Sequence, residues 1–166
     1  MRLPTFLSLL GTTAAIDIWL DFSNTSGNSG SISCVGLDKY QCCAITGRSD
    51  SPFKRVSVKY IPTNWDVVFS GHAGPQCGRI LREEASAGRT AFDFKDLSFG
   101  GSGYHFGPGG HPARSEGVGA YEVVRPSIVA LADGTQYNVT KLDDAAFNEM
   151  FVYIQTPQRT FSQVVY

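Results

Sequence analysis

The sequence is short of methionine and tryptophan and contains no long apolar run. Two methionines and two tryptophans stand beside 18 glycines in 166 residues. This composition is typical of a loop-rich β protein rather than of a helical bundle. No apolar run approaches the roughly 20 residues of a membrane-spanning helix, so we expect a soluble protein without a membrane anchor.

Charge of one sign is also scarce. The chain has 14 Lys and Arg against 15 Asp and Glu, which gives a formal net charge of −1. Domains that bind nucleic acid usually carry a clear basic excess. We therefore expect no nucleic-acid partner.

Common catalytic and metal-binding motifs are missing as well. The sequence has no G-x-S-x-G elbow, and no lysine-bearing helix follows Gly101-Ser102-Gly103 as a phosphate loop would require. His105 and His111 lack the i, i+4 spacing of a metalloprotease pair. We assign no catalytic residue, no cofactor and no metal ligand. Whether the protein is an enzyme stays open, and a non-enzymatic role is favoured.

The most informative feature that is present is the beginning of the chain. Met1-Arg2 gives a positive start, Leu3 to Leu10 is a compact apolar run, and Thr13-Ala14-Ala15 offers small residues for cleavage. This order is typical of a secretory signal. We predict that residues 1–15 are removed and that residues 16–166 form a single secreted, extracellular domain.

Export places the four cysteines in an oxidising compartment, where disulfides form. Cys34, Cys42, Cys43 and Cys77 allow three pairings. Neighbouring residues in an extended chain point their Cβ atoms apart, so a bond between Cys42 and Cys43 is disfavoured. Two pairings stay open: Cys34–Cys42 with Cys43–Cys77, or Cys34–Cys43 with Cys42–Cys77. Adjacent central cysteines do not match the spaced pairs of a zinc site.

Two acceptor sequons agree with export, and they predict a glycoprotein. They are Asn24-Thr25-Ser26 and Asn138-Val139-Thr140.

Short strands with frequent turns dominate the chain after Phe53, whereas residues 24–33 are small and polar and predict a flexible segment. Asp133-Gly134 is the strongest hairpin signal, and residues 143–149 predict a short helix. The pattern favours a mainly β sandwich or barrel with at most one short helix. The predicted strands are residues 56–60, 65–69, 79–82, 90–94, 120–124, 127–132, 135–140 and 151–155.

Residues 100–119 contain eight glycines and two prolines, which predicts a long surface loop. Loops on a rigid scaffold are where binding residues concentrate. We predict that Tyr104, Phe106, His111 and Arg114 form an exposed contact surface there. Of the other aromatic residues, Trp65 lies in an apolar strand and is expected in the core.

An acid–base site is the alternative interpretation of the same loop. His105 and His111 lie near Arg114, and Glu116 or Glu122 could act as a base. Secreted fungal ribonucleases work with these residue types, although the order and spacing match no such family.

Two resemblances to known proteins follow from these features. The leader, the Cys42-Cys43 pair, the sequons and the short strands resemble small secreted proteins of filamentous fungi, many of them suspected effectors. The run S-V-K-Y-I-P-T-N-W-D-V-V-F-S-G, within residues 57–84, is similar to the βγ-crystallin Greek key. That similarity implies a Greek-key sandwich. It implies no calcium site, because Asp143-Asp144 is followed by Ala-Ala-Phe-Asn rather than by paired Ser or Thr.

The sequence thus predicts a secreted, disulfide-stapled β-sandwich that acts without catalysis, through a loop-borne surface, as an effector-like interaction protein. Its partner would be an extracellular protein or a cell-wall glycan. A secreted hydrolase, ribonuclease-like or glycan-acting, and a wall-polysaccharide binder are the alternatives.

Overall fold

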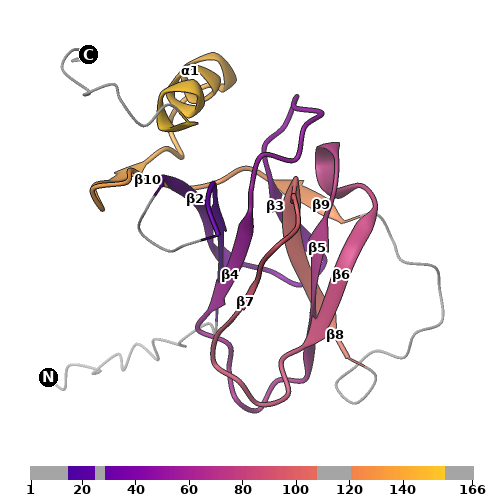
Figure 1. Ribbon diagram of the computed structural model, residues 1–166. Coiled ribbons are helices and arrows are strands. Elements are labelled where there is room, and N and C mark those ends of the chain that lie inside the picture. The colour runs from indigo at the N-terminus through magenta and orange to yellow at the C-terminus, as the bar shows by residue number, and fades with distance from the viewer. Residues whose placement is uncertain (1–14, 25–28, 108–120, 156–166) are drawn as a thin grey trace, which may run out of the picture.

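The computed structural model describes residues 15–24, 29–107 and 121–155, and the predicted leader lies outside them. Two β-sheets pack face to face as a sandwich, and one helix lies at an end of it, next to β2 and β10 (Figure 1). The predicted class, a mainly β sandwich stapled by disulfides with one short helix, is confirmed.

The first sheet has six strands, and all its neighbouring strands are antiparallel. In spatial order they are β11 (Gln136–Asn138), β10 (Ile128–Ala130), β2 (Ser31–Leu37), β1 (Ile16–Asp21), β4 (Arg55–Lys59) and β7 (Phe92–Phe94). The β10–β11 hairpin turns at Asp133-Gly134, as the sequence predicts.

The second sheet has five strands. In spatial order they are β6 (Ile80–Ala85), β5 (Val67–His72), β8 (Gly101–Phe106), β3 (Gln41–Ala44) and β9 (Glu122–Val124). Only the β3–β9 pair among these is parallel. The chain passes between the two sheets several times, so each sheet combines strands that are distant in the sequence.

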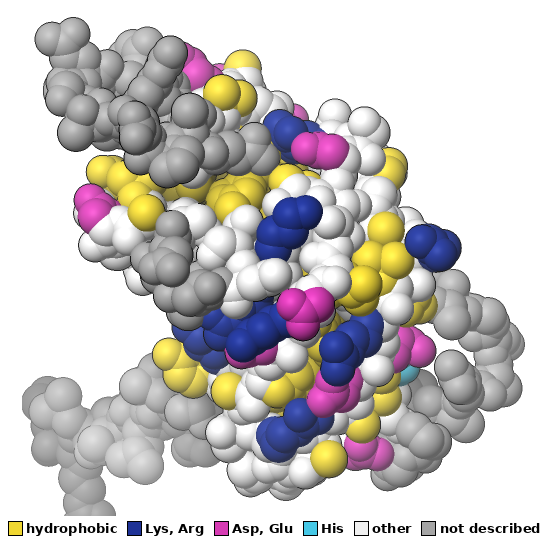
Figure 2. All heavy atoms as spheres, viewed as in Figure 1, with side chains coloured by type: hydrophobic (Ala, Val, Ile, Leu, Met, Phe, Trp, Pro, Cys, Tyr) yellow, Lys and Arg dark blue, Asp and Glu magenta, His cyan; other side chains and the backbone are white. Residues whose placement is uncertain are grey.

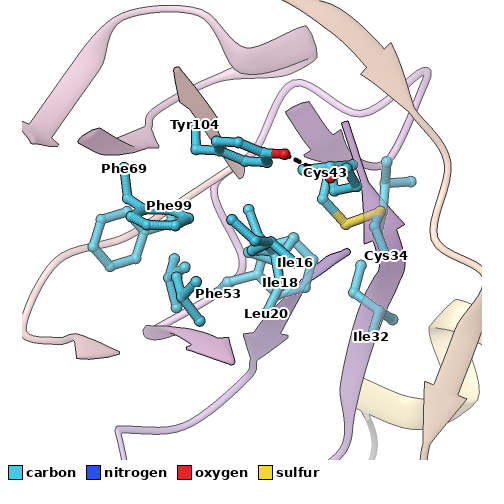
Figure 3. Packing of buried hydrophobic residues seen from close by; sticks show 14 of the residues in the cluster. Ile16, Ile18, Leu20, Ile32, Cys34, Cys43, Phe53, Phe69, Phe99 and Tyr104 are labelled. Atoms are coloured by element: carbon cyan, nitrogen blue, oxygen red, sulfur yellow. Dashed lines mark hydrogen bonds between the residues drawn. A yellow bond between two sulfur atoms is a disulfide. The ribbon is translucent and has the colours of Figure 1, made fainter. Parts of the chain in front are cut away.

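The core lies between the sheets and is built by alternation along the strands. Ile16, Ile18 and Leu20 of β1 are fully buried, and they meet Phe69 and Tyr104 of the second sheet in one cluster (Figure 3). Alternate side chains of a strand point to opposite faces, which places every second residue inside. Each such large apolar side chain stabilises the fold by about 1.5–3 kcal/mol.

The two disulfides are formed as Cys34–Cys43 and Cys42–Cys77, which selects one of the two open pairings. Cys43 faces the core and joins β3 to β2 in the opposite sheet (Figure 3). Cys42 faces the outer side of the second sheet and bonds the 3-10 turn Pro75–Cys77. Adjacent residues of one strand therefore hold two different parts of the chain.

The helix α1 (Asp144–Gln155) begins where the sequence predicts a helix but is longer. Asp143 caps it, since its Oδ1 accepts a hydrogen bond from the Ala146 backbone N–H at 2.8 Å. The predicted strand at residues 151–155 is wrong, because these residues continue the helix. Phe147, Phe151 and Ile154 recur at helical spacing and enter the core.

The prediction of a flexible segment at residues 24–33 is wrong at its end. Residues 31–33 belong to β2, where Ile32 is fully buried in the core. Ser31 and Ser33 flank it on the opposite face of the strand, and these small polar residues conceal the strand in the sequence. The strands β1 and β3 were likewise not predicted.

The glycine-rich stretch is a strand in its first part, which corrects the prediction of a loop over residues 100–119. Residues 101–106 form β8 in the middle of the second sheet. A Cβ at Gly101 would lie 2.8 Å from the Cys77 Sγ, and one at Gly103 would meet the Gln41 carbonyl oxygen. These glycines permit close packing against the disulfide and β3. Residues 108–119 lie outside the described residues.

Charged side chains of both signs line the edge strands β6 and β7. Arg55 pairs with Asp93 at 2.8 Å, and Glu84 pairs with Arg82 at 3.1 Å and with Arg89 at 2.8 Å. Figure 2 shows basic and acidic side chains side by side on this face, without a patch of one sign. Such charges discourage another strand from pairing with an exposed edge.

In the described part of the chain, no helix combines the length and apolarity needed to cross a membrane.

Candidate functional site

Tyr104 does not lie on an exposed loop, so this part of the predicted contact surface is wrong. It is in β8, only 2% exposed, and its ring packs 5.5 Å from that of Phe69 (Figure 3). Its hydroxyl donates a hydrogen bond to the Leu37 carbonyl oxygen at 3.0 Å. Burial raises the pKa of Tyr104 to about 12. The strand alternation turns this side chain into the core.

Phe106, the last residue of β8, is half-buried at the end of the sandwich. Its ring meets Trp65 edge to face with the centroids 5.3 Å apart. The Lys39 ammonium lies 5.8 Å from the same ring centroid. Trp65 is also half-buried and packs against the core from its rim. The other two predicted contact residues, His111 and Arg114, lie outside the described residues.

Tyr40 is an exposed aromatic residue that the sequence analysis missed. It lies between β2 and β3, is 41% exposed and has a φ of 62°. Its ring stacks on His105 with the centroids 6.4 Å apart and an interplanar angle of 14°. We call Tyr40 and His105 the aromatic patch. Phe106 follows His105 in β8 and points to the opposite face, where it packs against the core with Trp65.

The backbone of Tyr40 is fixed on both sides. Its N–H donates to the Tyr104 carbonyl oxygen at 2.8 Å, and its carbonyl oxygen accepts from the Glu122 N–H at 3.0 Å. A non-glycine residue at positive φ persists only where its surroundings impose it. Nothing in the sequence around Tyr40 signals this conformation, because its partners come from β8 and β9.

A chain of hydrogen bonds crosses the outer side of the second sheet beside the patch. The Ser70 Oγ lies 2.8 Å from the His72 Nε2 and 2.9 Å from the Tyr121 hydroxyl. The Tyr121 hydroxyl lies 3.1 Å from the His105 Nδ1. At the other end, the His72 Nδ1 lies 3.1 Å from the Gly78 carbonyl oxygen.

The Gly78 carbonyl oxygen determines which atoms donate in the hydrogen bonds of His72. A carbonyl oxygen only accepts, so the His72 Nδ1 carries the proton, and the Nε2 of the neutral ring accepts the Ser70 O–H. Burial lowers the pKa of His72, which favours this neutral ring. Burial also raises the pKa of Tyr121, so its hydroxyl, 2.9 Å from the Ser70 Oγ, stays protonated.

A serine hydroxyl bonded to a neutral histidine is the arrangement that nucleophilic hydrolases use. Here Ser70 is 0% and His72 1% exposed, and the Ser70 Oγ also lies 2.9 Å from the Tyr121 hydroxyl and 3.4 Å from the Gly103 carbonyl oxygen. The Ser70 hydroxyl is therefore buried in the folded protein. These hydrogen bonds connect Tyr121, which precedes β9, to Ser70 and His72 in β5.

The predicted acid–base set is not assembled among the described residues. His105 is bonded to Tyr121, and the exposed Glu122 accepts a hydrogen bond from the Gln41 Nε2 at 3.3 Å. His111, Arg114 and Glu116 lie outside the described residues. Within those residues no group of three or more His, Cys, Asp or Glu side chains could hold a metal ion.

Both predicted glycosylation residues have exposed side chains. Asn138 ends β11 and Asn24 follows β1, whereas Thr25 and Ser26 of the first sequon lie outside the described residues.

Comparison with known proteins gives a family and nothing beyond it. No curated protein and no solved structure matches the chain. One family, ARB_05566_N, described as an N-terminal domain, matches residues 17–130. This range runs from β1 through β10 and contains both disulfides, the aromatic patch and the Ser70–Tyr121 bond. The match covers most of the sequence, and the chain belongs to the ARB_05566_N N-terminal domain family.

Proposed function

We propose that this protein is a secreted, non-catalytic, effector-like interaction protein. It acts outside the producing cell by binding an extracellular protein through the aromatic patch. The observation that carries the proposal is the exposed ring of Tyr40, which is stacked on His105 and held by backbone hydrogen bonds on both sides.

Preorganisation supports a binding role for Tyr40. The residue lies between β2 and β3, and Cys34 and Cys42 of these strands are both in disulfides. A side chain that is already held in place loses little conformational entropy when a partner binds. Tyrosine and tryptophan are enriched among the residues that dominate interface energetics.

The surroundings of the patch favour a protein as the partner. Asp38 and Lys39 precede Tyr40 and are exposed, and the backbone N–H of the exposed Glu122 donates to the Tyr40 carbonyl oxygen. Aromatic residues are enriched at protein–protein interfaces, and the rim of such an interface is polar. Export is supported by the two disulfides, since such bonds persist in oxidising compartments and are rare in the cytosol.

Photo-crosslinking tests the proposal, with a matched control in the same chain. Tyr60 is also an exposed tyrosine at positive φ, 69% exposed with a φ of 61°, but it lies outside the patch. A photoreactive phenylalanine replaces Tyr40 or Tyr60 in the secreted protein, which is then irradiated in extracellular fluid. We expect an adduct with one extracellular protein from position 40 and none from position 60.

The affinity of the recovered partner is then measured for Y40A and Y60A. Y40A should weaken binding at least tenfold, the cost of about 1.4 kcal/mol or more that a central aromatic carries. Y60A should bind as the wild type does. Equal affinity of Y40A and wild type would remove the patch from the interface. Sedimentation with chitin or β-glucan without an adduct would replace the protein partner by a wall polysaccharide.

A hydrolase is the second candidate, and the 2.8 Å contact between Ser70 and His72 favours it. A fluorophosphonate probe would label Ser70 if substrate could reach it. We expect no labelling of the native protein and no turnover of RNA, chitin or glucan. Labelling that disappears in S70A, or turnover of a polymer, would contradict the non-catalytic proposal.

A further inference from the structure

The second sequon begins at the end of β11, the edge strand of the first sheet, whereas the aromatic patch lies on the second sheet. Asn138 ends β11 and is followed by Val139 and Thr140. We infer that Asn138 carries an N-linked glycan in the exported protein, and that this glycan covers the outer edge of the first sheet. The inference rests on the export included in the proposed function.

The side chains of the sequon leave room for a glycan on Asn138. Val139 is 1% exposed, and its N–H donates to the Ser127 carbonyl oxygen at 2.9 Å. Asn138 is its neighbour in an extended segment, so its side chain points the other way and is exposed. A large hydrophilic group on Asn138 therefore extends into solvent and leaves the core unchanged.

The amide oxygen of Asn138 is bound to the third residue of the sequon. Its Oδ1 accepts hydrogen bonds from the Thr140 N–H at 3.0 Å and from the Thr140 hydroxyl at 2.6 Å. These contacts direct the Oδ1 toward Thr140 and the Nδ2 away from it. Within the described part of the chain, the Nδ2 has no hydrogen-bond partner, so a sugar attached to this atom displaces none.

The reaction requires a sugar donor and a transferase of the secretory pathway. The Asn138 Nδ2 forms a bond to the anomeric carbon of an oligosaccharide carried on a lipid diphosphate. The bond from that carbon to the diphosphate oxygen breaks, and the lipid diphosphate leaves with the electron pair. One Nδ2 proton passes to a base of the transferase, and nothing is oxidised or reduced.

The position of Asn138 also determines what the glycan covers. Leu131 and Thr135 are hydrogen-bonded at 2.8 Å, as are Ser127 and Val139 at 2.9 Å, across the β10–β11 hairpin. Because hydrogen-bonding directions alternate along a strand, the backbone groups of Asn138 face away from β10. Among the described residues no strand lies beyond β11. Unlike β6 and β7, β11 has no charged residue to discourage pairing.

The test uses the full chain expressed in a eukaryotic secretory host behind a heterologous leader, so that entry into the secretory pathway does not depend on residues 1–15. Wild type, N138Q, T140A, T140S and N24Q are purified, and the peptide containing residue 138 is weighed before and after peptide N-glycosidase. We expect a glycan in wild type, T140S and N24Q. N138Q and T140A should lose it by at least tenfold. An unmodified Asn138 in secreted wild-type protein overturns the inference.

Sedimentation velocity tests the coverage of the edge. N138Q should associate at concentrations where wild type and N24Q stay monomeric. If N138Q is as monomeric as wild type, the edge does not need the glycan and that part of the inference is wrong. If N138Q is not secreted, the pair T140A and T140S answers the same two questions. Secretion of the chain with its own first 15 residues is measured separately, so a failure of export is distinguished from a failure of glycosylation.

Discussion

Cys42 and Cys43 are neighbours in β3, yet their sulfur atoms form disulfides on opposite faces of the same sheet. Cys43 crosses the core to Cys34, and Cys42 holds the turn that contains Cys77. The turn at Cys77 leads directly to Gly78, whose carbonyl orients His72. The outer disulfide thus supports the hydrogen-bond chain, and the inner one joins the two sheets.

The first prediction compares the two disulfides. Their sequence separations are 9 and 35 residues. Loop-closure entropy gives about 2.5 kcal/mol for the shorter loop and about 4 kcal/mol for the longer one. C42A/C77A should therefore lower the free energy of unfolding in urea more than C34A/C43A does. The opposite order would mean that packing of the buried sulfurs between the sheets outweighs loop closure.

The second prediction concerns the hydroxyl of Tyr121. Y121F leaves the Ser70 Oγ and the His105 Nδ1 without this partner. Losing a buried hydrogen-bond partner typically costs about 1–3 kcal/mol. Y60F is the matched control, since Tyr60 is 69% exposed and should change stability by less than about 0.5 kcal/mol. Equal unfolding midpoints of the two variants would show that the hydrogen bonds of the Tyr121 hydroxyl do not stabilise the fold.

The third prediction is a dependence of stability on pH caused by His72. Burial lowers its pKa below the ordinary 6.5, so the unfolded chain binds a proton at a higher pH than the folded protein does. Its contribution to stability is present above pH 6.5 and is lost as the pH falls through the folded-state pKa. H72Q should unfold with a smaller dependence on pH in this window. Parallel curves for H72Q and wild type would exclude His72 as the source.

The fourth prediction concerns the attachment of α1. The Phe151 ring is fully buried against Phe22 at 5.2 Å and Phe53 at 6.2 Å. F151A should cost about 3–5 kcal/mol and increase amide exchange throughout the helix. Val152, the next residue, is 58% exposed, so V152A serves as the control and should change little. A stable F151A with a protected helix would show that this ring does not hold α1 on the core.

How far the sequence predicts the fold depends on where each element finds its partners. The β10–β11 hairpin joins neighbouring segments of the chain, so the turn residues Asp133-Gly134 are enough to predict it. Residues 151–155 contain β-branched and aromatic side chains and look like a strand. In the helix, however, Phe151 packs against Phe22 and Phe53, and Phe147, four residues earlier on the same face, also enters the core. Tertiary packing overrides local propensity there.

The candidate site was harder to predict than the fold. The glycines around Tyr104 suggested a loop. Gly101 and Gly103 instead lie in a strand where a larger side chain has no room, because Cys77, Gln41 and Tyr121 pack against them. Tyr40 lies in no motif, and its conformation depends on hydrogen bonds to residues 104 and 122. A sequence pattern reports neighbours along the chain, whereas these contacts join distant strands.

By itself the sequence determined the β class, the hairpin at Asp133-Gly134 and the need of Cys42 and Cys43 for separate partners, because turn chemistry and strand alternation are local. Only the tertiary structure decided which cysteine each of them bonds, that Tyr104 is buried and that Tyr40 is exposed. Those outcomes depend on how strands separated by up to about a hundred residues pair within two sheets, and strand pairing of that range leaves no periodic trace in the chain.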